Sequence, residues 1–341
     1  MSSLVDGGTP PGARLFKCGI VLHCGAPGAW DAGMVESPVV WWDARRSLYG
    51  MVYTGYAHIH PGRRGYDTVA TPQIGLAWSK NLLHWERDPH APVLGPSGIS
   101  GTPDEGGATG PFLWHEGERY YLFYFGVTGR GYEKGRKTLN LACSDDLRTW
   151  ERYSGNPIIE PAGSGWRRDA IWHPHVVKVT DQYYLFFNAS GIHQGREEEF
   201  IGYATSPDLK SWSVDDEHSP VLVGSGKPGR WDATSRAGDP SLYRRGDRWY
   251  MAYYSWDGIH SRDGIASTTA EAFPLGWIPY AGNPVLDVGM PGAPDALHAG
   301  KPFIIETGGR HYHYYTAVDE QENREIALAL WPGPCAGGGR T

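Results

Sequence analysis

The fold is decided by the stretch Trp30-Asp31-Ala32-Gly33-Met34-Val35-Glu36-Ser37-Pro38-Val39-Val40, because the chain contains five versions of it. Each version has a Gly/Pro turn, an Asp, a few residues, a Pro and then an apolar run that ends in aromatic residues. The repeated Asp residues are Asp31, Asp104, Asp169, Asp232 and Asp295, and the prolines stand at 38, 111, 174, 240 and 302. The two residues before each Pro differ between versions: Glu-Ser, Thr-Gly, Trp-His, Gly-Asp and Gly-Lys. Because the surrounding residues recur while these two vary, the positions before each Pro are predicted to carry the catalytic and binding residues.

Each Pro is followed by strand-like segments, which in the first unit lie near 38–43, 48–56, 74–78 and 85–94. Aromatic and β-branched runs bounded by Gly, Pro and Asp predict strands, and continuous apolar runs predict sheets packed on both faces. A turn of the form Ser-x-x-Leu-x-x-Trp also recurs, at 79–85, 144–150 and 206–212. The prolines are 73, 63, 66 and 62 residues apart. Four strands per unit at this period predict a β-propeller.

The two ends of the chain complete one another. The fifth unit has a third strand near 325–330 and no fourth, whereas residues 16–22 match a fourth strand. We therefore predict an all-β, five-bladed β-propeller whose N-terminal strand closes the last blade and removes open sheet edges. The chain 1–341 is predicted to be one domain, with blades at about 36–95, 109–160, 172–223, 238–287, and 300–331 plus 14–24. Two stacked β-sandwich domains, the alternative, do not explain the shared fourth strand.

Composition excludes several classes of protein. Hydrophobic residues make up 40% and aromatic residues 13% of the 341, which suits a packed core rather than a disordered chain. The net charge of −7 and the lack of a long basic cluster predict no nucleic-acid partner. No apolar run is long enough to cross a membrane, and the N-terminus lacks the features of a secretory signal, so we expect a cytoplasmic protein.

The four cysteines, Cys18, Cys24, Cys143 and Cys335, do not have zinc-site spacing. A Cys18–Cys24 disulfide is one alternative, and free buried thiols are the favoured one in a chain without an export signal.

At these motifs the chain resembles the five-bladed propeller glycosidases, namely glycoside hydrolase families 43, 32, 62, 68, 117 and 130. The resemblance covers almost the full chain and rests on the Ser-x-x-Leu-x-x-Trp turns, the Asp-x-x-x-Val-x-x-Pro-x-Val entry at 31–40 and the Tyr-x-Met-x-Tyr-x-Gly strand at 49–55. The Trp-Met-Asn-Asp-Pro-Asn-Gly and Arg-Asp-Pro signatures of family 32 are missing. Gly238-Asp239-Pro240 stands where Glu-Gly-Pro often carries the acid of family 43.

The first strand of each propeller blade lines the central channel, so the tips of several blades converge there. Glycosidic cleavage needs a proton donor and a second carboxylate. The resemblance implies a base or nucleophile from the first blade, Glu36 or Asp31, and Asp239 of the fourth blade as the acid. Glu36 lies two residues before its Pro and Asp239 one residue before, and adjacent strand residues face opposite ways.

The repeated Asp residues have a structural alternative, because a short acceptor after a turn can bond local backbone amides. Asp169 lies in the third blade, where the resemblance implies a carboxylate that tunes the pKa of the acid. We therefore keep Asp169 as a catalytic candidate.

Further candidates for substrate binding at the channel mouth are Glu105, Trp172, His173, His175, Arg236, His298 and Lys301. His173 and His175 alternate along a strand and are predicted to share a face, where with His298 they could surround a structural cation or a water on the axis. No cofactor and no catalytic metal are expected. Arg236 and Lys301 could bind a carboxylated sugar or a phosphate, or could pair with a nearby Asp.

Tryptophans 41, 114, 172 and 256 could stack on sugars, although packing within blades is their usual role. A loop at 58–64 accounts for the longer first spacing and could wall the pocket.

The sequence thus predicts an exo-acting glycoside hydrolase whose partner is an oligosaccharide or small glycoside, with neither nucleic acid nor membrane involved. Inversion is favoured because the family 32 nucleophile motif is absent. The alternatives are a glycoside phosphorylase and a non-catalytic carbohydrate-binding propeller.

Overall fold

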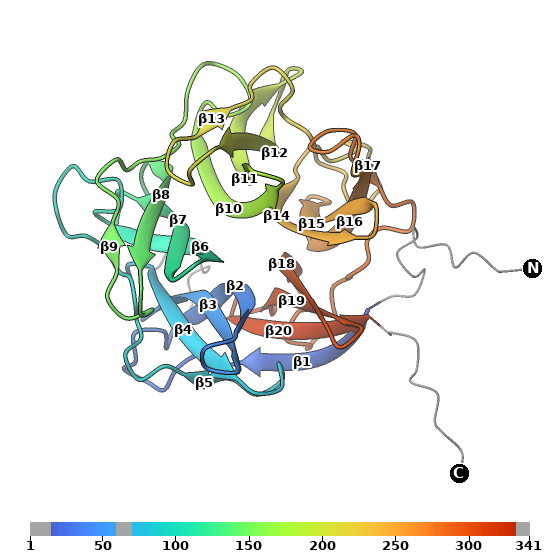
Figure 1. Ribbon diagram of the computed structural model, residues 1–341. Helices are drawn as coiled ribbons and strands as arrows, with labels where there is room; N and C mark the ends of the chain where they lie inside the picture. The colour runs from blue at the N-terminus through green and yellow to red at the C-terminus, as the bar shows by residue number, and fades with distance from the viewer. Residues whose placement is uncertain (1–14, 59–69, 332–341) are drawn as a thin grey trace, which may run out of the picture.

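The computed structural model describes residues 15–58 and 70–331, and every regular element in these ranges is a β-strand. The strands form five four-stranded antiparallel sheets around a common axis, which confirms the predicted five-bladed propeller (Figure 1). No helix in the described ranges could span a membrane. From residue 59 onward the loop predicted at 58–64 lies outside the described residues, as does Cys335.

Each blade runs from an inner strand at the axis to an outer strand at the rim. Blade 1 contains β2 (Met34–Asp43), β3 (Leu48–Tyr56), β4 (Gln73–Ser79) and β5 (Glu86–Arg87); blade 2 contains β6 (Gly107–Glu116), β7 (Arg119–Val127), β8 (Lys137–Ser144) and β9 (Glu151–Arg152); blade 3 contains β10 (Ala170–Val179), β11 (Gln182–His193), β12 (Arg196–Ser206) and β13 (Ser213–Val214); blade 4 contains β14 (Gly238–Arg245), β15 (Arg248–Trp256), β16 (Ser261–Thr269) and β17 (Ile278–Pro279); blade 5 contains β18 (His298–Thr307), β19 (Arg310–Val318), β20 (Arg324–Trp331) and β1 (Phe16–Leu22).

The ring closes as predicted. The N-terminal strand β1 pairs with β20 in antiparallel register, from Phe16 opposite Leu330 to Leu22 opposite Ile326, and the two lie side by side in Figure 1. The inner strands contact one another in the order β2, β6, β10, β14, β18, and β18 contacts β2 again. The last blade therefore contains strands from both ends of the chain. Its fourth strand is β1, which pairs with the edge of β20 that would otherwise be exposed.

Every inner strand carries a β-bulge at the same place. Register shifts occur between Glu36 and Val39 in β2, and at the equivalent positions of the other four inner strands. The residue just before the Pro has a left-handed backbone in each blade, with φ from 48° to 58°, and we call these five residues the hub tips: Ser37, Gly110, His173, Asp239 and Lys301. A bulge re-aims the side chains beside it. Strict alternation is therefore interrupted at these positions and does not decide the relative directions of Glu36 and Asp239.

Three of the repeated Asp residues join the inner, second and outermost strands of their own blade. Asp31 is fully buried, accepts a hydrogen bond of 2.9 Å from the Tyr53 hydroxyl and pairs with Arg87 at 2.7 Å. Asp104 with Tyr124 and Arg152, and Asp295 with Tyr315 and Lys17, repeat the arrangement. The structural role is thus right. In these three blades the partners are a tyrosine of the second strand and a cation of the outermost strand, whereas Asp232 accepts from the Ser225 backbone amide, as predicted.

The thiols of Cys18, Cys24 and Cys143 are free, as favoured, although Cys18 is exposed rather than buried. Trp41 packs edge-on against Trp78, and Trp114 packs edge-on against Tyr183 of the next blade. These two tryptophans therefore belong to the packing of the blades.

Candidate functional site

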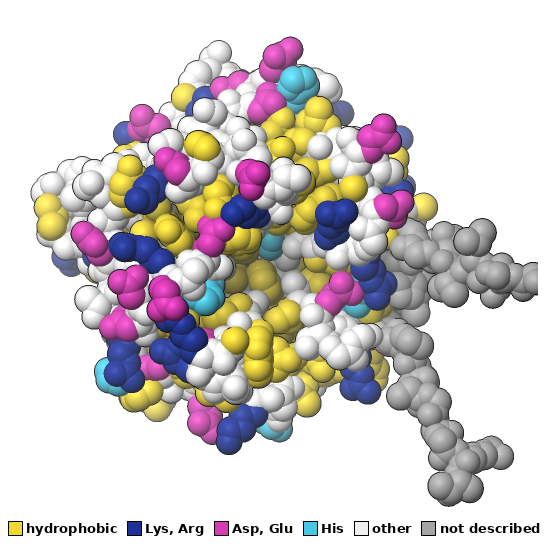
Figure 2. All heavy atoms as spheres, in the orientation of Figure 1, with side chains coloured by type: hydrophobic (Ala, Val, Ile, Leu, Met, Phe, Trp, Pro, Cys, Tyr) yellow, Lys and Arg dark blue, Asp and Glu magenta, His cyan; other side chains and the backbone are white. Residues whose placement is uncertain are grey.

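A pocket of about 220 Å³ opens at one end of the ring axis and is lined by residues of blades 2 to 5. Figure 2 shows the molecule along this axis, with a hollow at its centre and charged side chains around the rim. Six of the predicted site residues line the pocket: Trp172, His173, Arg236, Asp239, His298 and Lys301. The hub tips of blades 3, 4 and 5 are among them, so the bulged inner strands bring distant parts of the chain to one place.

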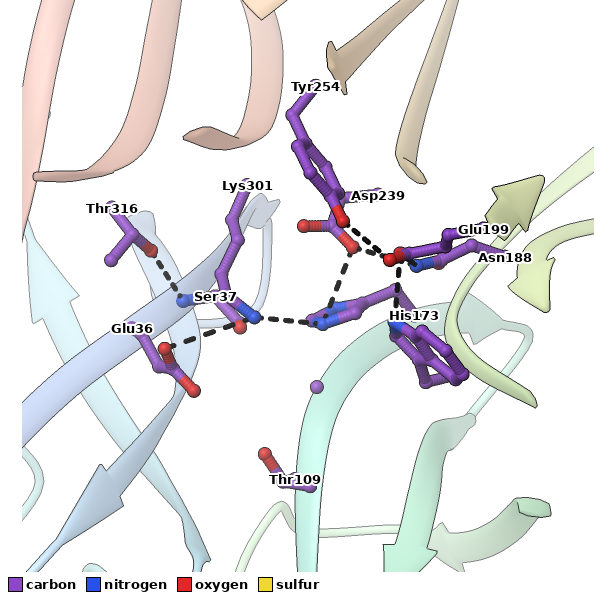
Figure 3. A network of polar contacts seen from close by, with 12 residues as sticks. Glu36, Ser37, Thr109, His173, Asn188, Glu199, Asp239, Tyr254, Lys301 and Thr316 are labelled. Carbon is purple, nitrogen blue, oxygen red and sulfur yellow. Dashed lines mark hydrogen bonds and ion pairs between the residues drawn. The ribbon is translucent and has the colours of Figure 1, made fainter. Parts of the chain in front are cut away.

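Asp239 belongs to a close pair of buried carboxyl groups. Asn188 of β11 donates one amide hydrogen to Oε1 of Glu199 and the other to Oδ1 of Asp239, at 3.2 Å in the second case (Figure 3). Both carboxyl groups are more than nine-tenths buried. Burial, together with the negative charges of Glu199 and Glu133, holds the pKa of Asp239 well above its usual range.

Glu199 is surrounded by donors. The Tyr254 hydroxyl donates to its Oε2 at 2.6 Å, the Trp172 indole donates to its Oε1 at 3.1 Å, and Arg236 lies 3.8 Å from Oε2. Burial raises the pKa of Glu199, while Arg236, Tyr254 and Asn188 act in the opposite direction. Hydrogen bonds to both oxygens of Glu199 favour its ionised form, whereas burial raises the pKa of both members of the pair.

The Lys301 ammonium lies at the centre of the hub. Its Nζ is 3.0 Å from His173 Nε2, 3.8 Å from Glu133 and 3.9 Å from Glu36. Burial opposes the charge on Lys301, but the carboxylates of Glu36, Asp239 and Glu133 outweigh it and raise the pKa of Lys301. The pocket therefore holds a permanent cation among several carboxyl groups.

Glu36 lies beneath the pocket rather than on its wall. Its side chain is fully buried, its Oε2 pairs with Arg324 of β20 at 2.9 Å, and the Tyr132 hydroxyl donates to the same oxygen at 3.4 Å. Tyr132 stacks on Tyr56 and precedes Glu133 in the segment between β7 and β8. The carboxylate that reaches the pocket wall from this side of the hub is therefore Glu133.

The three predicted histidines have separate surroundings. His175 accepts a hydrogen bond from the Leu242 amide, lies between Phe112 and Phe303, and borders a smaller cavity of about 30 Å³ further along the axis. Burial lowers the pKa of His175 to about 3. His298 accepts from the Ser261 amide, and burial lowers its pKa to about 4. Among the described residues no group of three or more His, Cys, Asp or Glu could hold a metal ion.

The remaining predicted residues lie at or beyond the pocket margin. Arg236 pairs with Glu198 and lies over the Trp256 ring at 4.7 Å. Glu105 accepts from the Gly101 amide and does not line the pocket. Asp31 is held in its buried ion pair, and Asp169 pairs with Arg168 at a side-chain exposure of 40%. Neither Asp31 nor Asp169 lines the pocket: Asp31 lies three residues before β2 and Asp169 directly before β10, and each pairs with an arginine.

Sequence reasoning missed Glu199, Glu133 and Tyr254. Glu199 is the last residue of the run Glu197-Glu198-Glu199 in β12. Three acidic residues at the start of an otherwise apolar strand could have indicated a buried carboxyl group. Glu133 follows the glycine-rich segment at 129–131, which has no counterpart in the other blades. Glu199 and Glu133 lie outside the repeated frame on which the prediction depended, whereas Tyr254 lies in β15, the second strand of blade 4.

Residues 66–227 match the family model described as "Glycosyl hydrolases family 32 N-terminal domain". No match was found among curated protein sequences. Among solved structures, the chain is similar to one described as "Glycoside hydrolase", with 24% identity, a TM-score of 0.74, and coverage of 93% of this chain and 93% of that chain.

Two further solved structures share the fold. A thermostable family-43 glycoside hydrolase has 17% identity and a TM-score of 0.63, covering 92% of this chain and 91% of that one. A β-1,2-mannobiose phosphorylase from Listeria innocua has 13% identity and a TM-score of 0.62, covering 88% and 89%. The partial family match and the shared fold confirm the predicted resemblance to the five-bladed propeller glycosidase superfamily. Both hydrolases and phosphorylases occur among these similar proteins.

Proposed function

We propose that the protein is an exo-acting glycoside hydrolase that cleaves a terminal sugar in the pocket at the end of the ring axis. The observation that carries the proposal is the buried Glu199–Asp239 pair, which shares Asn188 as a donor and in which burial and nearby carboxylates raise the pKa of Asp239. A proton donor of raised pKa is what departure of a glycosidic oxygen requires. The pocket is closed at its inner end by the hub tips, which suits the end of a glycan.

In this proposal Asp239 is the acid, as expected from the sequence, and Glu199 takes the tuning role expected of Asp169. Asn188 occupies Oδ1 of Asp239, so the proton belongs on Oδ2. Glu133 is the second carboxylate, because it lines the pocket whereas Glu36 is fully buried. We propose inversion, with Glu133 activating a water.

A phosphorylase is the second candidate, since the cationic side chains of Arg236, Lys301 and Arg324 line the pocket. Each of these cations lies within 4 Å of a carboxylate: Arg236 of Glu198, and Lys301 and Arg324 of Glu36. Their charge is largely balanced inside the protein, which favours water over a phosphate dianion as the acceptor. A non-catalytic lectin has no need of a buried acid, which disfavours the third alternative.

The test is turnover of an aryl-glycoside panel covering arabinofuranose, fructofuranose, galactose and mannose, with and without inorganic phosphate. We expect phosphate-independent release from one sugar, first-formed product of inverted configuration by ¹H NMR, and at least about a 100-fold loss in Asp239→Asn. Strict dependence on phosphate would replace the hydrolase with the phosphorylase. Turnover that survives Asp239→Asn would remove the acid from the mechanism.

A further inference from the structure

His173 contacts both the cation and the acid of the pocket. Its Nε2 lies 3.0 Å from Lys301 Nζ and 3.4 Å from Oδ1 of Asp239 (Figure 3). An ammonium group has donors and no acceptor, so Nε2 must be the acceptor in the first contact. The imidazole is then neutral and carries its hydrogen on Nδ1.

This protonation state determines what kind of contact His173 makes with Asp239. An unprotonated Nε2 cannot donate to the carboxyl group, so the 3.4 Å approach is not an ion pair. Burial and the charge of Lys301 also hold the pKa of His173 well below its usual value. His173 therefore presents no positive charge to Asp239 at any pH near neutrality.

Lys301 forms ion pairs with Glu36 and Glu133. Asp239 lies beyond the ion-pairing distance of Lys301, and both groups contact the same ring nitrogen, Nε2 of His173. A cation in direct contact with Asp239 would favour the ionised carboxylate and remove the donor proton. His173 Nε2 accepts from the Lys301 ammonium and lies 3.4 Å from Asp239, so it engages the cation beside the acid.

The backbone holds the ring there. His173 is a hub tip with φ of 48°, its ring is packed edge-on against Phe125, and the neighbouring hub tip is Gly110. A Cβ at position 110 would stand 3.1 Å from His173 Nδ1 and 2.3 Å from Phe125. The absence of a side chain in blade 2 thus makes room for the imidazole of blade 3.

We propose that His173 is a positioning residue: as a neutral acceptor it engages the Lys301 ammonium and prevents that cation from pairing with Asp239. The inference about protonation rests on these contacts, and its meaning for catalysis rests on the proposed function.

The other charged groups of the hub surround this arrangement. Asp239 faces Glu199, Glu133 and Lys301, with Tyr254 close by. Lys301 in turn faces Glu36, Glu133 and Arg324. None of these groups is replaced in a variant at position 173. A change in the Asp239 titration midpoint in such a variant therefore reports a change in the interaction between Lys301 and Asp239.

The test is a ¹³C carboxyl titration of the ligand-free, aspartate-labelled protein, with the Asp239 signal assigned from its loss in Asp239→Asn. His173→Gly removes the acceptor at a backbone conformation that glycine prefers, and His173→Gln retains an acceptor. We expect the Asp239 midpoint to fall by about one pH unit or more in His173→Gly, to remain near wild type in His173→Gln, and not to fall in His173→Gly/Lys301→Met. In wild type, ¹⁵N shifts should show a neutral His173 with its hydrogen on Nδ1.

An unchanged Asp239 midpoint in His173→Gly, a fall that persists without Lys301, or a doubly protonated His173 at neutral pH would overturn the inference. The titration needs no substrate. The inference can therefore fail while glycoside turnover stands, and the predicted titration can be found in a protein that cleaves none of the glycosides.

Discussion

Replacing Glu199 by Gln should move the alkaline limb of the pH–rate profile to lower pH. Glu199 and Asp239 bond the same Asn188 nitrogen, so their oxygens lie within about 6 Å of each other. At this separation and an effective dielectric constant of about 20, Coulomb's law gives about 3 kcal/mol, or about two pKa units.

The sign follows from the role of the acid. Asp239 must be protonated to donate, and the negative charge of Glu199 raises its pKa. Removal of that charge lets Asp239 ionise at lower pH, so the active form is lost about two pH units earlier as pH rises.

The assay is kcat/KM between pH 4 and 10 on the cleaved aryl glycoside. Glu197→Gln is the matched control, because Glu197 lies two residues away on the same strand, is 70% exposed and pairs with Arg168. An alkaline limb that stays in place, or moves upward, in Glu199→Gln would refute the reasoning.

Two predictions concern stability. Asp31→Ala should lower the free energy of unfolding by about 3 kcal/mol, because Arg87 and Tyr53 lose a buried partner, while kcat stays within about twofold. Urea unfolding measures the stability, and turnover at 20 °C measures kcat. A selective loss of turnover would restore Asp31 to the mechanism. Ser37→Gly should stabilise the protein by about 1 kcal/mol, because glycine adopts the left-handed backbone at this position without strain. Gly110→Ala should destabilise the protein, because its new Cβ would meet the Phe125 ring. Destabilisation by Ser37→Gly or stabilisation by Gly110→Ala in urea unfolding would contradict the account of the hub tips.

The fold could be predicted because it repeats. Five copies of one frame at a nearly constant spacing determine both the number of blades and the place of the shared strand. The tips before each Pro were also found this way, and three of them, His173, Asp239 and Lys301, meet in the pocket.

What escaped prediction does not repeat. The bulge at each tip is a backbone property that strict alternation cannot express, so alternation alone could not give the directions of Glu36 and Asp239. Glu199 comes from a third strand and Glu133 from an irregular segment, and their nearness to Asp239 follows from the curvature of the ring rather than from any local pattern.

The central claim, that Asp239 donates the proton to the departing oxygen, is tested most directly by leaving-group dependence. We expect Asp239→Asn to lose about 100-fold or more in kcat/KM on an alkyl glycoside and to retain most of its rate on a dinitrophenyl glycoside, whose departure needs no acid. Equal losses on the two substrates would show that Asp239 acts in some other way.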